Sequence, residues 1–144
     1  MEIDGKRVIS SKEAMVLDSP PKKMIIIGSG AIGSEFAYYY NEFGTEVHLV
    51  EMMDRVLPVE DDDVSKEVER NFKKSGIKIS LGTKVSQIDS LKTKVKVHTK
   101  KDDKKEILEG DVALLAVGVT GNIENIGLEN LGITTNHGAI KINE

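Results

Sequence analysis

The order of apolar and polar positions along the chain predicts strands that alternate with helices. Continuous apolar runs at residues 24–27 and 111–117 are typical of strands buried on both faces, as in a parallel sheet. Shorter segments at residues 46–50 and 77–80 predict two further strands. Four strands of a buried sheet are therefore expected.

Two segments between these runs have helical periodicity. Apolar residues recur every three or four positions across residues 31–43 and 61–75. Gly44 and Gly76 follow these segments, where a left-handed glycine commonly ends a helix. The order of strand, glycine-rich turn, helix and strand over residues 25–51 predicts a βαβ unit.

Residues 84–109 follow a different pattern. Val95 and Val97 alternate with polar residues, the period of two that is typical of a strand with one face in water. We expect an antiparallel β-meander here. The elements together predict an α/β fold, a Rossmann-like parallel sheet with helices on both faces and an antiparallel β-meander as a crossover.

Residues 1–21 are predicted to be a connecting segment that precedes the domain. They hold a short extended piece at residues 6–9 and a capping box, Ser10 with Glu13, that predicts one helical turn. Pro20 and Pro21 then form a joint. Because residues 1–18 lie beyond this joint, we expect them to be displaced from the domain or bound to a neighbouring molecule.

Composition excludes several classes of protein. A length of 144 residues suits one domain, and a net charge of −4 with abundant acids and bases argues against nucleic acid as a partner. There is no cysteine, which excludes disulfides and thiolate metal sites within this chain. The histidines at 48, 98 and 137 are scattered, so no metal site is expected. No apolar run suits a membrane span or a signal peptide, so we expect the cytoplasm, or the mitochondrial matrix in a eukaryote.

The glycine-rich turn carries the candidate chemistry. Gly28 permits a tight turn, Gly30 lets a pyrophosphate approach the backbone, and Gly33 lets the helix pack closely on the sheet. Ala31 and Ile32 begin the helix, where free N–H groups and the helix dipole favour phosphates. Chance occurrence of the three glycines is the alternative, but the strand before them and the helix after them favour a dinucleotide site.

An acid at the end of the next strand indicates which dinucleotide binds. Glu51 comes 18 residues after Gly33 and would accept hydrogen bonds from the adenosine ribose while repelling a 2′-phosphate, which favours NAD over NADP. Met52 is placed to cover the adenine, or to fill the core. Arg55 is expected to form a surface ion pair with Asp54 or Glu51.

Four motifs resemble the NAD-binding domain of the flavin-dependent pyridine nucleotide–disulfide oxidoreductases. Within that family the likeness is greatest to the dihydrolipoamide dehydrogenases, and it covers essentially the whole chain. The motifs are MIIIGSGAIGSEFA at residues 24–37, VEMMDRVLP at 50–58, LLAVG at 114–118 and GNIENIGLENLGI at 121–133.

The resemblance implies further site residues. Val85 would meet the adenine edge, Gly118 would lie beside the nicotinamide end, and Glu35 would lie close to the nicotinamide. On the residues alone, Glu35 would point away from the phosphates and toward the nicotinamide half, or it is simply a solvated acid in the first turn of the helix. Many members of the family carry Arg-x-Pro-Asn after the glycine equivalent to Gly118, whereas this chain has Val-Thr-Gly-Asn at residues 119–122.

The resemblance also implies a larger parent enzyme. Residues 22–138 would be its NAD-binding domain, and residues 139–144 would begin the return to a flavin domain. The partners would be the flavin and dimerisation domains of a homodimer within a 2-oxo acid dehydrogenase complex, and FAD would be bound outside this chain. No catalytic residue is expected here, so the chain alone should be inactive. The alternatives are another member of the family, such as an NADH oxidase, and a free-standing NAD-sensing module.

The insertion implied by the resemblance also predicts where the ends of the domain lie. A chain that leaves one domain and returns to it crosses the same boundary twice. The segments around Lys22 and Ala139 are therefore expected to be neighbours.

Overall fold

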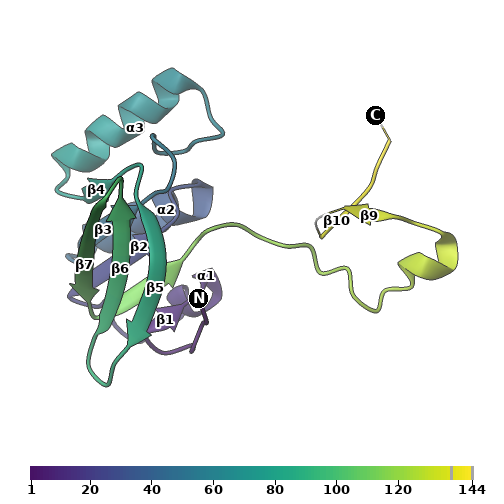
Figure 1. Ribbon diagram of the computed structural model, residues 1–144, viewed down its shortest axis with the longest axis horizontal. Coiled ribbons are helices and arrows are strands. Elements are labelled where there is room, and N and C mark those ends of the chain that lie inside the picture. Colours follow the sequence, from purple (N-terminus) through teal and green to yellow (C-terminus); the bar gives the residue numbers. More distant parts are fainter. Residues whose placement is uncertain (137, 144) are drawn as a thin grey trace.

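A central sheet of five parallel strands organises the protein, in the order β1-β8-β2-β3-β4 (Figure 1). The computed structural model describes residues 1–136 and 138–143, so His137 and Glu144 lie outside the described residues. The four strands expected from apolar runs are present, and the Rossmann-like α/β fold class is confirmed. In spatial order the strands are β1 (Val8–Ile9), β8 (Val112–Leu115), β2 (Lys23–Ile27), β3 (Glu46–Val50) and β4 (Lys78–Ser80).

Three helices pack on one face of this sheet. They are α1 (Ser11–Ala14), α2 (Ala31–Glu42) and α3 (Asp62–Lys74). Each helix contributes to a single apolar cluster that also contains the strand residues facing that side. The helix residues in this cluster are Ala14, Ala37, Tyr40 and Phe72.

An antiparallel sheet covers the opposite face, so the expectation of helices on both faces is wrong. This sheet consists of β5 (Lys84–Ser90), β6 (Val95–Lys101) and β7 (Lys104–Gly110), which are the expected meander. Val95, Val97 and Leu108 form a second apolar cluster with Ile25 and Ala113 of the central sheet. The alternating apolar side of the meander therefore buries the face that a helix would otherwise cover.

The N-terminal segment belongs to the domain and is not displaced from it. β1 pairs in parallel with β8 and forms an edge of the central sheet. The expected capping box of Ser10 and Glu13 is present at α1. The Tyr40 hydroxyl donates a hydrogen bond of 2.6 Å to the Ala14 carbonyl, which ties α1 to α2. Apolar burial of Val8, Ile9 and Ala14 holds this segment in place.

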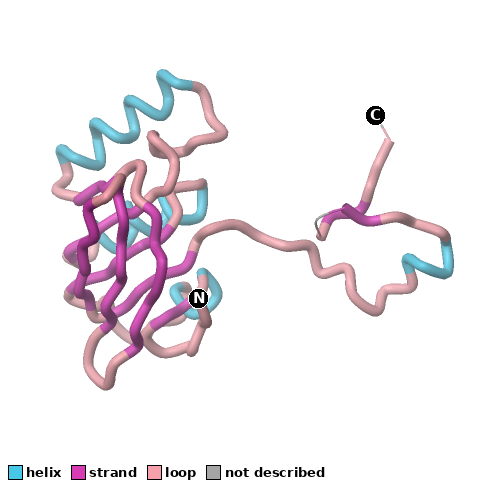
Figure 2. The backbone as a smooth tube through the Cα atoms, in the orientation of Figure 1, coloured by secondary structure: helices cyan, strands magenta, loops and turns pink. Residues whose placement is uncertain are grey.

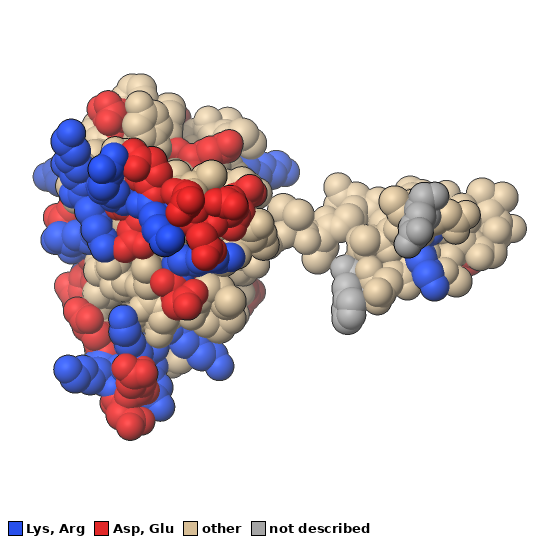
Figure 3. Space-filling view, turned by 90° about the horizontal axis from the view of Figure 1, so that it is seen from above, with Lys and Arg blue, Asp and Glu red and all other residues tan. Residues whose placement is uncertain are grey.

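Residues 119–143, the C-terminal segment, project away from the rest of the protein (Figures 1 and 2). They contain a 3-10 turn (Leu128–Leu131), β9 (Thr135–Asn136) and β10 (Ala139–Ile140), and β9 pairs with β10. Both apolar clusters draw only on residues up to Ala116. The domain surface carries interspersed charges, whereas this segment is mostly uncharged (Figure 3).

The expectation that the two ends of the domain are neighbours is not met. β10 lies apart from β2, and therefore Ala139 does not lie beside the start of the domain (Figure 1). Among residues 119–136 and 138–143, no apolar residue belongs to either cluster. Without such burial, nothing apolar draws the segment back to the domain.

Candidate functional site

The glycine-rich turn lies at the carboxyl end of β2, where the chain passes into α2. Gly28 has a φ of +98°, and its N–H donates a hydrogen bond of 2.9 Å to the Val50 carbonyl of β3. A Cβ on Gly28 would lie 2.3 Å from the Ala116 carbonyl oxygen. Both conformation and space therefore exclude a side chain. The turn sits at the edge where parallel sheets bind ligands.

Gly33 and Gly30 have opposite surroundings, although both belong to the same motif. A Cβ on Gly33 would lie 1.9 Å from the Gly28 carbonyl oxygen, so α2 can pack on the turn only without a side chain at this position. A Cβ on Gly30 would have no atom within 4 Å. Gly30 is also the N-cap of α2, and it has no side chain that could cap the helix with a hydrogen bond. Open space and an uncapped helix N-terminus together suit a phosphate group.

The Glu51 carboxylate is held at the end of β3, beside this turn. Its Oε2 accepts the Ser29 N–H at 2.7 Å and the Ser29 hydroxyl at 2.9 Å, and its Oε1 accepts the Met53 N–H at 2.8 Å. The Glu51 residue is 8% exposed. A buried carboxylate is stable only with such partners, and these partners also fix its orientation.

A cleft of 460 Å³ joins several of the residues predicted from the sequence, and we call it the glycine cleft. Its walls come from the ends of β2, β3 and β8, from the start of β5 and from the loop before it. Met52 is 62% exposed and therefore has a free apolar surface on the cleft side of β3. The predicted site residues that line the glycine cleft are Gly28, Gly30, Glu51, Met52, Val85 and Gly118.

Four other predicted residues are not among those that line the glycine cleft in the described part of the chain. Gly33 is packed beneath the turn, and Ala31 and Ile32 can reach a ligand only through the helix N-terminus. Ala31 and Glu35 line a groove between α2 and α3 instead. Glu35 also borders a pocket between α1 and α2. The structure therefore places Glu35 beside the grooves that flank α2.

Several residues at this site could not be predicted from the sequence. Ser29 stands between two motif glycines, at a position where the motif specifies no residue type. Its polar side chain alone does not indicate a function. Thr83 and Lys84 line the cleft as well. The Thr83 N–H donates to the Glu51 carbonyl at 2.8 Å, and this bond joins the loop before β5 to the end of β3. Such contacts depend on how the strands pair and leave no periodic pattern in the sequence.

Arg55 is not among the described residues that line the glycine cleft. It forms an ion pair with Asp62 at the start of α3, and it donates a hydrogen bond of 2.8 Å to the Pro58 carbonyl. The expected pairing with Asp54 or Glu51 is therefore wrong. The guanidinium instead joins the loop after β3 to α3.

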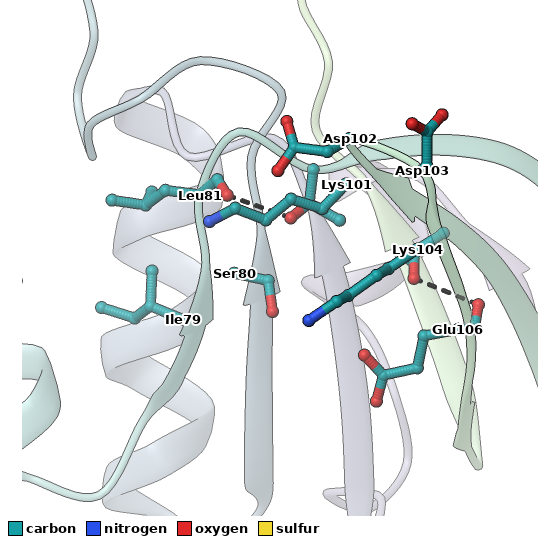
Figure 4. Close-up of a pocket in the computed structure, with 10 residues that line it drawn as sticks. Ile79, Ser80, Leu81, Lys101, Asp102, Asp103, Lys104 and Glu106 are labelled. Atoms are coloured by element: carbon teal, nitrogen blue, oxygen red, sulfur yellow. Dashed lines mark hydrogen bonds between the residues drawn. The ribbon is translucent and has the colours of Figure 1, made fainter.

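A second cleft, of 530 Å³, lies beside the loop at residues 81–83 (Figure 4). We call it the lysine cleft, because Lys101 and Lys104 extend into it over Ser80. The Ser80 hydroxyl lies 2.9 Å from His48 Nε2, and burial lowers the pKa of His48. Thr83 borders both clefts. The lysines and acids at residues 101–104, which line this cleft, are exposed.

Residues 1–136 and 138–143 contain no helix that is long and apolar enough to cross a membrane. The same residues contain no group of three or more His, Asp or Glu side chains that could hold a metal ion.

Comparisons with known proteins agree with this geometry. The sequence model of the family described as pyridine nucleotide-disulphide oxidoreductase matches residues 1–144. The dihydrolipoyl dehydrogenases of Chlorobaculum tepidum and Bacillus subtilis are 39% and 40% identical, over 98% and 100% of this chain. This chain spans only 30% and 31% of their lengths.

Solved structures give the same result. The HOCl-induced flavoprotein disulfide reductase RclA from Escherichia coli superposes with a TM-score of 0.82 at 29% identity, covering 99% of this chain and 32% of its own. LpdA from Mycobacterium tuberculosis superposes with a TM-score of 0.81 at 32% identity, covering 94% of this chain and 29% of its own. The glycine turn, the parallel sheet with its meander and these relatives agree: the chain belongs to the pyridine nucleotide-disulphide oxidoreductase family.

Proposed function

We propose that this chain is the NAD(H)-binding domain of a flavin-dependent dihydrolipoamide dehydrogenase. The observation that carries the proposal is the Glu51 carboxylate, held by Ser29 and Met53 in the same cleft as the open space at Gly30. An adenosine ribose requires a hydrogen-bond acceptor, and the pyrophosphate that follows it requires an open helix N-terminus close by. Glu51 and Gly30 offer these two features in one cleft. The similarity to dihydrolipoyl dehydrogenases supports the choice of enzyme.

Each part of the dinucleotide has residues that suit it. Gly28, Gly30 and the start of α2 would hold the pyrophosphate, and Glu51 would hold the adenosine ribose. Met52 and Val85, which line the same cleft, would contact the adenine. Gly118, at the end of the cleft formed by β8, would lie toward the nicotinamide. Because a carboxylate at position 51 repels a 2′-phosphate, the site would prefer NAD to NADP.

In the parent reaction, dihydrolipoamide and NAD⁺ give lipoamide and NADH, and NAD⁺ supplies the hydride acceptor when it is bound. The part of this chain is to bind and orient that cofactor. The chain contains no cysteine, so it cannot supply a redox disulfide. The chain alone is therefore expected not to reduce NAD⁺ with dihydrolipoamide, which an absorbance assay for NADH would check.

The proposed partners are the flavin and dimerisation domains of a homodimeric parent enzyme in a 2-oxo acid dehydrogenase complex. Exposed apolar residues of the C-terminal segment support such packing, since Leu131 is 76% and Ile142 is 83% exposed. A large apolar side chain gains free energy when a neighbouring domain removes it from water. The curated relatives are bacterial, and on that basis we propose a cytoplasmic location.

Another disulfide reductase of the same family is the second candidate, because RclA superposes closely on this chain. Such an enzyme would share the dinucleotide site and differ in the substrate bound outside this chain. Assays of the parent enzyme with dihydrolipoamide and with other disulfide substrates would separate the two candidates.

Titration calorimetry of the chain with NAD⁺, NADH and NADP⁺ tests the binding proposal. We expect NAD⁺ and NADH to bind at least about tenfold more tightly than NADP⁺, because the extra phosphate would meet the Glu51 carboxylate. Equal affinity for NADP⁺ would contradict the role of Glu51. A lack of binding by any nucleotide would contradict the proposed function itself.

A further inference from the structure

Ser29 is fully buried, yet both of its hydrogen-bond donors point to one oxygen atom. The backbone N–H and the side-chain hydroxyl of Ser29 donate to Glu51 Oε2, at 2.7 and 2.9 Å. The residue is 0% exposed. Ser29 lies in the turn after β2 and Glu51 lies at the end of β3, so these bonds join two neighbouring strand ends.

These contacts limit how many further hydrogen bonds Glu51 can accept. A carboxylate offers about four acceptor positions, two on each oxygen. The two donors of Ser29 occupy both positions of Oε2, and the Met53 N–H occupies one position of Oε1 at 2.8 Å. One position, on Oε1, is left for a ligand.

We propose that Ser29 is a positioning residue that leaves Glu51 able to accept one hydroxyl of the adenosine ribose, not two. This inference rests on the proposed function, since it concerns how the same site reads the ribose. It adds that the 2′- and 3′-hydroxyls contribute unequally, because only one of them can reach the free acceptor of Glu51.

The Ser29 hydroxyl can be removed without taking away the bonds that shape the turn. The Ser29 carbonyl accepts the Leu57 N–H at 2.9 Å and the Ser34 hydroxyl at 3.0 Å. Its N–H continues to donate to Glu51 in a Ser29→Ala variant. The substitution therefore deletes one donor to Oε2, and Glu51 loses part of what holds its carboxylate in a single orientation.

The first experiment uses the unmodified chain and analogues of NAD⁺ that lack one hydroxyl of the adenosine ribose. Calorimetry should show that one of the 2′-deoxy and 3′-deoxy analogues binds about tenfold more weakly than NAD⁺, and that the other binds within about twofold. Equal losses for the two analogues would overturn the inference while leaving the proposed function intact. If NAD⁺ itself does not bind, the proposed function fails and the inference fails with it.

The second experiment compares two matched variants of the turn. Ser29→Ala should weaken NAD⁺ binding by about three- to tenfold and reduce the penalty for the sensitive deoxy analogue, because the acceptor is less fixed. Ser34→Ala also deletes a buried hydroxyl from this region, but that hydroxyl donates to the Ser29 carbonyl and not to Glu51. It should leave the analogue penalty unchanged.

Thermal unfolding of both variants separates positioning from stability. Similar losses of stability in Ser29→Ala and Ser34→Ala, with a change in the analogue penalty only for Ser29→Ala, support the positioning role. The same change of penalty in both variants would show that the hydroxyls act through the stability of the turn, and would overturn the inference. The analogue titrations on the unmodified chain decide the question if Ser29→Ala fails to fold.

Discussion

The two clefts that share Thr83 differ in how their charged groups are held. In the glycine cleft, Glu51 is 8% exposed and its carboxylate accepts the N–H and hydroxyl of Ser29 and the N–H of Met53. In the lysine cleft, Lys101 and Lys104 are exposed side chains on a hairpin (Figure 4). The lysine cleft is nevertheless larger, at 530 Å³ against 460 Å³.

We expect a charge that is held in place to favour ligand binding more than cleft volume does. A flexible lysine loses side-chain entropy when it binds a ligand, whereas Glu51 is already held in one orientation. Water also screens the charges of exposed lysines more effectively than that of a buried carboxylate. Substitutions in each cleft test whether the nucleotide binds in the glycine cleft and not in the lysine cleft.

The largest effect is expected from substitutions at two glycines of the same motif. Gly33→Ala should destabilise the protein by more than about 3 kcal/mol, because its Cβ would lie 1.9 Å from the Gly28 carbonyl oxygen. Gly30→Ala should change stability by less than about 1 kcal/mol, since its Cβ meets no atom within 4 Å, but it should still weaken NAD⁺ binding. Chemical denaturation and calorimetry measure the two effects. Normal NAD⁺ affinity in Gly30→Ala would show that the open space beside Gly30 is not the phosphate site.

A smaller effect is expected when the charge in each cleft is removed in turn. Glu51→Gln should lower NAD⁺ affinity by about tenfold and narrow the preference for NAD⁺ over NADP⁺, because it removes the anionic acceptor. Lys104→Ala is the matched control in the lysine cleft and should change NAD⁺ affinity by less than about twofold. Calorimetry of both variants gives the comparison. A larger loss of NAD⁺ affinity in Lys104→Ala than in Glu51→Gln would indicate that the nucleotide binds in the lysine cleft, and it would contradict the proposal.

The smallest effect is expected on the stability of the protein at low pH, through His48, which lies beside Ser80 of the lysine cleft. Burial lowers the pKa of His48 in the folded protein from its ordinary value of 6.5, with opposing contributions from Glu106 and Glu46 and further lowering by Lys23 and Lys78. Below pH 6.5 the unfolded chain therefore binds a proton that the folded chain resists binding. Stability contributed by His48 is full above 6.5 and is lost as the pH falls through the folded pKa.

A His48→Gln variant isolates this contribution. It keeps a polar side chain near Ser80 but cannot titrate, so its free energy of unfolding should fall less steeply than that of the unmodified chain below pH 6.5. Denaturant titrations on both sides of pH 6.5 measure the difference. Identical pH dependence in the two proteins would contradict the role of His48, and a change in NAD⁺ affinity would link the lysine cleft to the glycine cleft.

Much of the glycine cleft could be predicted because its main residues lie in one short strand–turn–helix–strand segment of the sequence. The run before Gly28 marks a buried strand, and the helix after Gly33 follows from its periodicity. The register of a parallel sheet then brings Ile27 opposite Val50, which places Glu51 beside the turn. No knowledge of distant contacts was needed to expect an acid at this position.

The helix arrangement and the packing of the N-terminal segment could not be predicted in the same way. The alternating pattern of Val95 and Val97 shows that β6 has one apolar side, but not which surface covers that side. Likewise, the short run of Val8 and Ile9 does not reveal that it pairs with β8, more than a hundred residues later. Burial of apolar area chooses among such surfaces, and that choice depends on the whole fold.

Chain geometry therefore accounts for the strand, the turn and the helix, since Gly28 needs a positive φ and Gly33 needs close packing wherever this motif forms. The hydrogen bonds between Ser29 and Glu51 are different, because these residues are 22 positions apart and meet only when β2 and β3 pair. A carboxylate buried this far from water must find donors nearby. Which donors it finds, and how many acceptor positions remain for a ligand, follows from the packed structure alone.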